Sequence, residues 1–200
     1  IEQLVTPLMS QPYFPVDIRK LPSQRSFHTL DGHEHIVWHR GESEPIIVRE
    51  GFQPQEGDVH LMVTLTNSHP LNGAAIYRIE YAGRSLVYAT DVEWKNQCEP
   101  AFLAFVHNAD VLIHDAQYTT SDYEQARQGF GHSTIEMATG VAQAAQVGQL
   151  ILFHHEPTYD DDKLDAMQAG ARSQFPRTSS ACEGMEIDLL ADDPTRGTQW

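Results

Sequence analysis

Three apolar runs of the sequence end in side chains that can bind a metal ion or move a proton. The run "SLVYATD" ends in Asp91, "VLIHD" ends in His114 and Asp115, and "LILFHH" ends in His154 and His155. Imidazole nitrogens and carboxylate oxygens are ligands of Zn²⁺ and Mn²⁺, and a carboxylate can bridge two such ions. The alternative is structural, because an Asp that follows a strand is often a turn residue or a helix cap.

Two further histidines stand where such a centre could use them. His69, in "SHP", follows another strand-like run, and His132, in "GHST", directly precedes a helical stretch. Ser133 and Glu136 have the spacing of a capping box at the start of that helix. A helix N-terminus attracts anions, so His132 is well placed to meet a phosphate. A local loop contact is the alternative for His132.

The elements that must position these side chains change in type along the chain. Up to residue 90 the sequence has short runs rich in β-branched and aromatic residues, and Ala82 and Gly83 predict a hairpin turn. After residue 91 helices and buried strands alternate, and the closely spaced apolar residues of 1–10 favour a helix that Pro7 weakens. The expected strands are 26–30, 34–39, 45–50, 59–66, 74–81, 84–90, 111–115, 149–155 and 184–190, and the expected helices are 100–109, 133–146 and 162–175.

This order of elements predicts an α/β or α+β fold with layered sheets and outer helices. In such folds ligand sites gather at the carboxyl ends of strands. We therefore expect His69, Asp91 and His154 to lie close together in space, with His132 and Asp115 at the rim of the same cleft.

Composition limits the partners. The chain has 200 residues, 40% of them hydrophobic, and a formal net charge of -15, which predicts one domain over 1–200 in a soluble, cytoplasmic protein without a membrane partner. The negative charge disfavours long nucleic acids, whereas a small anionic substrate held by metal ions is compatible with it. Cys98 and Cys182 are far apart and predict neither a disulfide framework nor a zinc ribbon.

Five segments of the sequence resemble those of the metallo-β-lactamase fold hydrolases, and among them the branch of ribonuclease Z and related phosphodiesterases. They occur in the same order as in that family. They are "SHPLNGAAIYRIE", "GRSLVYATDVE", "ADVLIHDAQY", "GHSTIEMATGVAQAA" and "LILFHHEP", and "PYFPV" at 12–16 also matches. The resemblance extends over residues 1–157. It implies an αββα sandwich of layered mixed sheets with outer helices.

The resemblance also implies roles for individual residues. His69 and His154 resemble metal ligands, and Asp91 resembles the carboxylate that bridges two metals. His132 resembles the histidine that protonates the leaving group or steadies the scissile phosphate. The pair His114 and Asp115 resembles the "HEAT" motif of that branch, with Asp in place of Glu. The Asp115 carboxylate could orient a neighbouring histidine, or it could simply cap the strand end. For His155 a supporting or substrate contact is expected instead of metal ligation.

One sequence motif of the family is missing. The HxHxDH motif, which in the family supplies four metal ligands upstream of the matched segments, is absent. The chain therefore resembles either a C-terminal portion of a longer hydrolase or a natural derivative that has lost catalysis. "GHEHIVWH" contains an HxH, but it lacks the aspartate and lies downstream of "PYFPV". We interpret His33, His35 and His39 as one face of a solvent-facing strand remote from the cleft. Each of two metals would then have only two ligands from this chain, short of the three usual for catalytic zinc.

These observations favour hydrolysis of a phosphodiester by a metal-bound hydroxide in a dinuclear Zn²⁺ or Mn²⁺ site. Thioester, lactone or lactam hydrolysis is an alternative. Only 21 residues separate His69 from Asp91, which leaves no room for the protruding RNA-binding arm of ribonuclease Z. A second hypothesis is a non-catalytic half-domain that pairs with another chain, a homodimer included, through an open sheet face.

Overall fold

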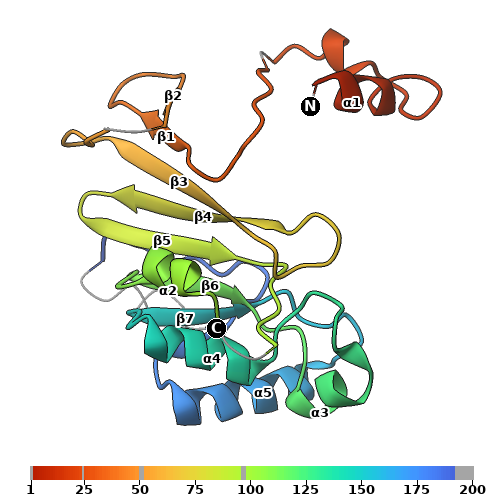
Figure 1. Cartoon of the computed structure of the whole chain (residues 1–200), viewed down its shortest axis with the longest axis vertical. Coiled ribbons are helices and arrows are strands. Elements are labelled where there is room, and N and C mark those ends of the chain that lie inside the picture. The colour runs from red at the N-terminus through yellow and green to blue at the C-terminus, as the bar shows by residue number, and fades with distance from the viewer. Residues whose placement is uncertain (1, 24, 50–51, 96–97, 192–200) are drawn as a thin grey trace. The chain divides into compact units, whose positions relative to one another are not determined.

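The structure is a computed structural model that describes residues 2–23, 25–49, 52–95 and 98–191 (Figure 1). The chain forms two compact units, residues 1–31 and 32–200. The single domain expected over 1–200 stays a prediction. The first unit contains helix α1 (Glu2–Leu8), which includes Pro7, and the 3-10 turn η1 (Ile18–Lys20). The strand expected at 26–30 does not form, because these residues have no regular structure.

The second unit is built on one mixed sheet of eight strands in the order β2-β1-β3-β4-β5-β6-β7-β8 (Figure 1). Neighbours are antiparallel from β2 to β5 and parallel from β5 to β8. The predicted hairpin turn joins β4 to β5, and Ala82 and Gly83 both have positive φ, as such two-residue turns require. The strands are β1 (His35–Trp38), β2 (Ile46–Val48), β3 (Val59–Thr66), β4 (Ala74–Tyr81), β5 (Arg84–Ala89), β6 (Val111–Asp115), β7 (Gln149–Phe153) and β8 (Thr178–Ser180).

Three helices, α2 (Pro100–Val106), α4 (Ile135–Ala144) and α5 (Asp161–Gln174), pack against one face of this sheet. The small residues Ala138 and Ala142 of α4, and Ala145 directly after it, are buried, which lets the helix approach the sheet closely. A single core results, in which strand residues such as Val87, Leu112 and Leu150 meet the helices. The short helix α3 (Thr120–Asp122) and the π-helix η2 (Tyr123–Arg127) were not expected from the sequence.

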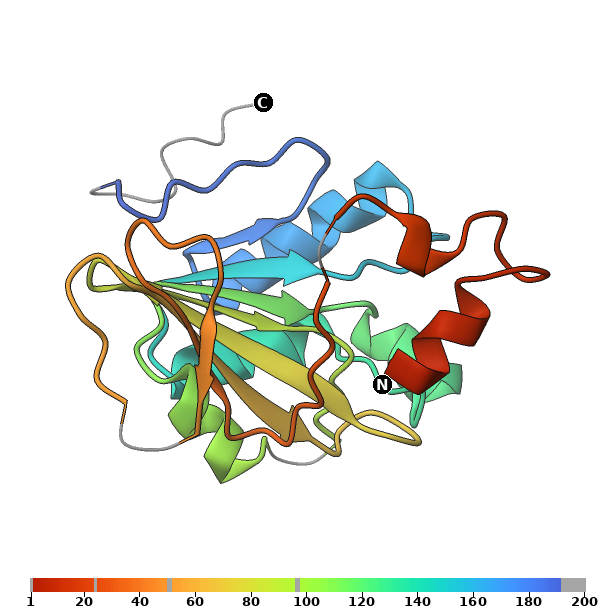
Figure 2. The same ribbon diagram turned by 90° about the horizontal axis from the view of Figure 1, so that it is seen from above.

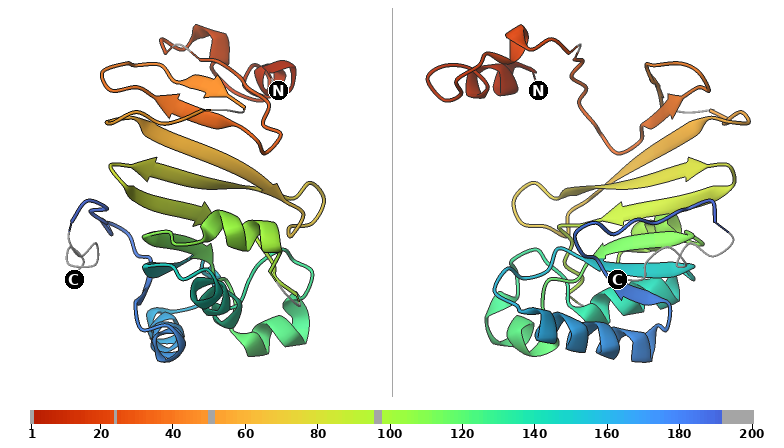
Figure 3. Two further views of the ribbon diagram at one scale, coloured as in Figure 1. Left: turned by 60° about the vertical axis from the view of Figure 1, so that its left-hand side comes forward. Right: turned by 180° about the vertical axis from the view of Figure 1, so that it is seen from behind.

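The opposite face of the sheet carries no helix of this unit that the structure describes. Within this unit, the described residues 181–191 after β8 cross part of it, as the view from behind and the view from above both show (Figures 2 and 3). We call this surface the open face. Val63, Val111 and Ile151 on this face are buried. Many of its other apolar side chains are half-buried or exposed, among them Ile36, Trp38, Leu61, Tyr77, Ile79, Leu86, Tyr88, Ile113 and Phe153.

The described residues of the second unit therefore form one mixed sheet with one helix layer. This half-sandwich is the arrangement expected of a C-terminal portion of an αββα fold. The strand expected at 184–190 does not form, because Thr178–Ser180 already pairs with β7 as the last strand. In the parts of the chain that the structure describes, no helix is both long and apolar enough to cross a membrane.

Candidate metal centre

The predicted strand endings converge at one edge of the sheet. β5, β6 and β7 are parallel neighbours, so Asp91, Asp115 and His154 follow or end adjacent strands at the same side. His154 Nε2 lies 3.6 Å from Asp91 Oδ1. Both residues have positive φ, 58° for Asp91 and 61° for His154. Such backbone conformations are unfavourable for residues other than glycine and concentrate at functional sites.

His69 and His132 complete this group. One ligand atom from each of His69, Asp91 and His132 lies within 4.8 Å of the others, and the same holds for Asp115, His132 and His154. The His132 ring stacks on the His154 ring at a centroid distance of 4.7 Å. The edge of the His69 ring meets the His132 ring, with centroids 5.6 Å apart. The structure thus brings together the five side chains that were expected to meet.

Asp115 lies beneath the cluster and not at its rim, because its side chain is 0% exposed. Its carboxylate accepts hydrogen bonds from the backbone N–H groups of Asp91 (3.1 Å), Gln117 (3.2 Å) and Ser133 (3.2 Å), and it also contacts His132 Nδ1 at 2.7 Å. With its oxygens occupied in this way, Asp115 is less suited to metal binding than Asp91, whose side chain is 46% exposed. Asp115 instead holds the His132 ring, so that Nε2 of His132 is turned away from the carboxylate.

The charge of His132 is also set by this contact. Burial of the ring is the largest influence and disfavours the imidazolium, but the hydrogen bond to Asp115 and the negative charges of Asp115, Asp91 and Glu93 together outweigh it. The pKa of His132 is therefore raised above its usual range. A histidine in this state retains a proton that it can donate near neutral pH.

His114 does not belong to the cluster, so the expectation that it takes part in catalysis together with Asp115 is wrong. Because adjacent strand residues point to opposite faces, His114 faces the helix-covered core when Asp115 faces the site. Its side chain is fully buried, its Nε2 accepts a hydrogen bond from Trp94 Nε1 (3.0 Å), and its Nδ1 contacts the backbone oxygen of Asp115 (2.6 Å). Burial lowers the pKa of His114. It is a neutral core residue.

Two other expectations concern the edges of the cluster. His155 belongs to neither ligand group, and burial is the main cause of its lowered pKa. Its contact with a substrate stays a prediction. The helix after His132 is capped by Thr134, whose side chain accepts from Met137 N, and not by Ser133. Ser133 Oγ instead donates to Val92 O at 2.6 Å, which ties the His132 loop to the segment after β5.

The histidines of "GHEHIVWH" are not candidate ligands in the structure, but only His33 is solvent-facing. β1 lies inside the sheet between β2 and β3, so its side chains find partners. His35 Nδ1 lies 2.8 Å from His60 Nε2, and His39 Nδ1 lies 2.9 Å from Asp58 Oδ1. The expectation of a solvent-facing strand is therefore wrong for His35 and His39, which make structural contacts.

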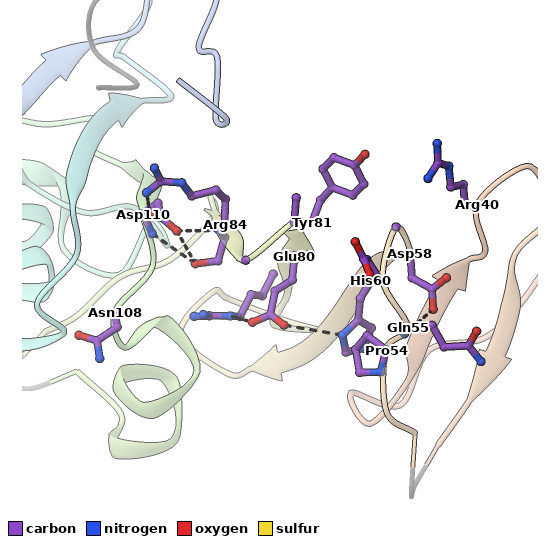
Figure 4. A pocket seen from close by; sticks show the side chains of 16 residues that line it. Arg40, Pro54, Gln55, Asp58, His60, Glu80, Tyr81, Arg84, Asn108 and Asp110 are labelled. Atoms are coloured by element: carbon purple, nitrogen blue, oxygen red, sulfur yellow. Dashed lines mark hydrogen bonds and ion pairs between the residues drawn. The ribbon is translucent and has the colours of Figure 1, made fainter. Parts of the chain in front are cut away.

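A cavity of about 830 Å³ contains none of the candidate ligands (Figure 4). It lies at the amino end of β6, whereas the ligands gather at the carboxyl end. Its charged groups are mostly paired with each other, as in Arg78 with Glu80 (2.8 Å) and Arg84 with Asp110 (2.9 Å). A smaller cavity of about 500 Å³ directly adjoins the site, and it is lined by Asn67, Ser68, His69, Pro70, Glu93, Trp94, Lys95, Glu99 and Gly129.

Two residues near the site were not singled out from the sequence. Gln117 Nε2 lies 3.3 Å from His154 Nδ1, and the buried side chain of Glu93 binds the loop before His132. Each stands two residues after a predicted site residue, Gln117 after Asp115 and Glu93 after Asp91. That spacing on an extended segment was the available signal, since such residues return to the same side.

The sequence of this chain is similar to a protein family model and to several proteins of known family. The family model described as the beta-lactamase superfamily domain matches residues 20–155. A ribonuclease Z of Picosynechococcus sp. is 39% identical over 123 residues, which cover 60% of this chain and 37% of the relative. A ribonuclease Z of Gemmatimonas aurantiaca is 34% identical over 167 residues, which cover 78% of this chain and 51% of the relative.

Among solved structures, the metallo-beta-lactamase fold protein YhfI from Bacillus subtilis has a similar fold. The TM-score is 0.51 at 23% sequence identity, and the match covers 64% of this chain and 47% of that one. The chain thus spans between about two fifths and one half of the length of the proteins named here.

Proposed function

The chain belongs to the beta-lactamase superfamily, and from this premise and the site geometry we propose that it contributes the metal-binding and proton-donating groups of a hydrolase acting on phosphodiesters. The observation that carries the proposal is the placement of the Asp115-bound imidazole of His132 directly beside His69, Asp91 and His154. This arrangement combines a candidate acid with candidate metal ligands, as phosphodiester hydrolysis requires.

The donor set fits a divalent metal. His69 Nδ1 is 3.2 Å from Pro70 O, which it can reach as a donor, so Nε2 is left for a metal. His154 presents Nε2 toward Asp91, and a Gln117 side chain turned with its carbonyl oxygen to Nδ1 would fix the same tautomer. We assign His69, Asp91 and His154 as the ligands of two Zn²⁺ or Mn²⁺ ions, with Asp91 shared between them.

When bound, the metals would lower the pKa of an attacking water and neutralise charge on the phosphoryl oxygens. His132 donates its proton to the leaving oxygen, and Asp115 keeps the ring oriented and stabilises its charged form. The cavity beside His69 receives the substrate. Its wall carries Lys95 together with Glu93 and Glu99, so the metals would supply most of the attraction for an anion. Each metal would have two protein ligands from this chain, His69 with Asp91 or Asp91 with His154, and water or another part of the protein would supply the others.

The relatives' name, ribonuclease Z, brings RNA into the range of phosphodiester substrates. The net charge of -15 and the short span between His69 and Asp91 favour a small phosphodiester over a long RNA. Hydrolysis of a thioester, lactone or lactam is the alternative, and the name of the relatives, ribonuclease Z, favours the phosphodiester over it.

Kinetics of two alanine variants test the proposal in the protein supplied with Zn²⁺ or Mn²⁺. His132→Ala should retain its metal and lose about 10²-fold or more in turnover, as expected for a missing general acid. The loss should shrink for a nitrophenyl diester, whose leaving group needs little protonation. Asp91→Ala should lose metal and turnover with every substrate. If His132→Ala loses metal as Asp91→Ala does, His132 is a ligand and the assigned role is wrong.

The open face favours a second candidate, a non-catalytic module that docks another sheet. Half-exposed aromatic side chains such as Tyr88 and Phe153, whose rings lie 5.9 Å apart, are typical of a surface that a partner covers. Such a module would associate with its partner equally well after Asp91→Ala and would show no metal-dependent turnover. The same pair of variants therefore separates the two candidates.

A further inference from the structure

Glu93 connects the two loops that carry His69 and His132. It lies two residues after Asp91, outside any strand, and only 5% of its surface is exposed. Its backbone N–H donates to Ser68 O at 3.1 Å, next to His69. Its carboxylate reaches in the other direction, toward the loop that precedes His132. No role for this buried carboxylate follows from the metal chemistry described above.

Three donors bind the Glu93 carboxylate. Oε1 accepts from the hydroxyl of Tyr123 and from the backbone N–H of Gly129, both at 2.7 Å. Oε2 accepts from the backbone N–H of Gly131 at 2.9 Å. Hydrogen bonds to a charged acceptor are shorter and stronger than neutral ones, and backbone donors fix the path of the chain. The loop from η2 to His132 is therefore fastened at both its beginning and its end.

Gly131 passes this constraint on to His69. A methyl group on Gly131 would lie 2.5 Å from Pro70 Cδ and closer still to His69 Cδ2, so the Gly131 backbone is in direct contact with the His69 ring. His132 is the next residue, and its ring meets the His69 ring edge-on. The position of Gly131, which Glu93 sets, thus fixes the separation of the two histidines.

We propose that Glu93 is a positioning residue that holds His69 and His132 in register through Gly129, Gly131 and Tyr123. The roles of the two histidines rest on the proposed function. The three hydrogen bonds of the Glu93 carboxylate, which we call the tether, do not depend on it. Removing it should let the loop 129–131 move away from His69 while the sheet and its core remain folded.

Nuclear magnetic resonance of this chain tests the tether without any assay of activity. In Glu93→Gln the amide nitrogen replaces one acceptor and meets an N–H donor. Amide exchange at Gly129 and Gly131 should then be about ten- to a hundredfold faster, the change expected for loss of one charge-assisted hydrogen bond. The Overhauser effect between Gly131 Hα and His69 Hδ2 should weaken. Tyr123→Phe, which removes one donor and no charge, should change both signals in the same direction but less.

Asp110→Asn is the matched control. Asp110 also accepts three hydrogen bonds, from Arg84 and from the backbone and side chain of Ser85, but it does so at the opposite end of the sheet. It should leave the signals of Gly129, Gly131 and His69 unchanged. A Zn²⁺ titration should then show about tenfold or more weaker binding for Glu93→Gln than for Asp110→Asn.

The outcomes distinguish failure of the tether from failure of the positioning role and of the proposed function. Unchanged exchange and an unchanged Overhauser effect in Glu93→Gln and Tyr123→Phe would overturn the tether. A released loop with unaltered Zn²⁺ affinity would overturn the positioning role. If the unmodified chain binds no Zn²⁺ while the loop responds as expected, the tether stands and the proposed function fails.

Discussion

Two aspartates that follow neighbouring strands have different environments and therefore different chemistry. The side chain of Asp91 is 46% exposed, and among the described residues it accepts one hydrogen bond, a long one from Thr90 Oγ1 at 3.5 Å. The side chain of Asp115 is fully buried and saturated by donors. An exposed carboxylate with unused oxygens can bind a metal, whereas a buried, saturated one can orient a neighbour.

The His132–Asp115 contact predicts a pH-dependent term in the stability of the metal-free protein. Because the pKa of His132 is raised in the folded state, its stabilising contribution is fully present below the unfolded value of about 6.5. It is lost as the pH rises through the folded value. The free energy of unfolding should therefore fall by more for His132→Gln at pH 5 than at pH 9, by about 2 kcal/mol for a charged hydrogen bond.

Chemical denaturation in the presence of a chelator measures this difference. The matched control is the same substitution in an Asp115→Asn background, where the carboxylate charge is gone and the pH-dependent part should disappear. An equal effect of His132→Gln at both pH values in the two backgrounds would show that the pair is not coupled by charge.

At the scale of elements, the loop before His132 depends on two glycines that differ in one respect. Gly129 and Gly131 both have positive φ, 85° and 94°, so alanine is strained by about 1 kcal/mol at either position. Only at Gly131 does a methyl group also collide with His69 and Pro70, whereas at Gly129 the nearest neighbour is Lys95 Nζ at 3.7 Å.

Gly131→Ala should therefore cost about 2 to 4 kcal/mol in free energy of unfolding, the sum of strain and overpacking. Gly129→Ala should cost about 1 kcal/mol. Gly131→Ala should also weaken metal binding, because His69 is displaced. Thermal or denaturant unfolding and a Zn²⁺ titration of both variants measure these effects. Similar losses at the two positions would mean that the contact with His69 is unimportant.

The sequence predicted the strand endings well but not the orientation of the side chains there. Apolar runs ending in Asp91, Asp115 and His154 identify buried parallel strands, and their common edge follows from the fold class. The sequence does not show which of His114 and Asp115 faces the site, because that depends on which face the helices cover. It also does not show that Thr178–Ser180 takes the edge position in place of 184–190.

At the scale of the whole molecule, the site lies at the end of a half-sandwich. The helix-covered face is closed by a continuous core, whereas the open face carries half-exposed apolar side chains. The HxHxDH motif is absent from the sequence, and the chain covers 37% of the length of one ribonuclease Z and 51% of another. Both facts agree with a metal centre in which this chain supplies only part of the ligands.

The most direct test is an anomalous difference map, recorded at the zinc edge, from crystals of this chain grown with Zn²⁺. The proposed roles predict density within about 2.0 to 2.2 Å of an Asp91 carboxylate oxygen and of Nε2 of His69 or His154. They also predict that His132 stays hydrogen-bonded to Asp115 through Nδ1 and outside bonding distance of the metal. Zinc bound to His132 Nε2 or to Asp115, or no zinc at Asp91, would contradict the proposed division between metal ligands and acid.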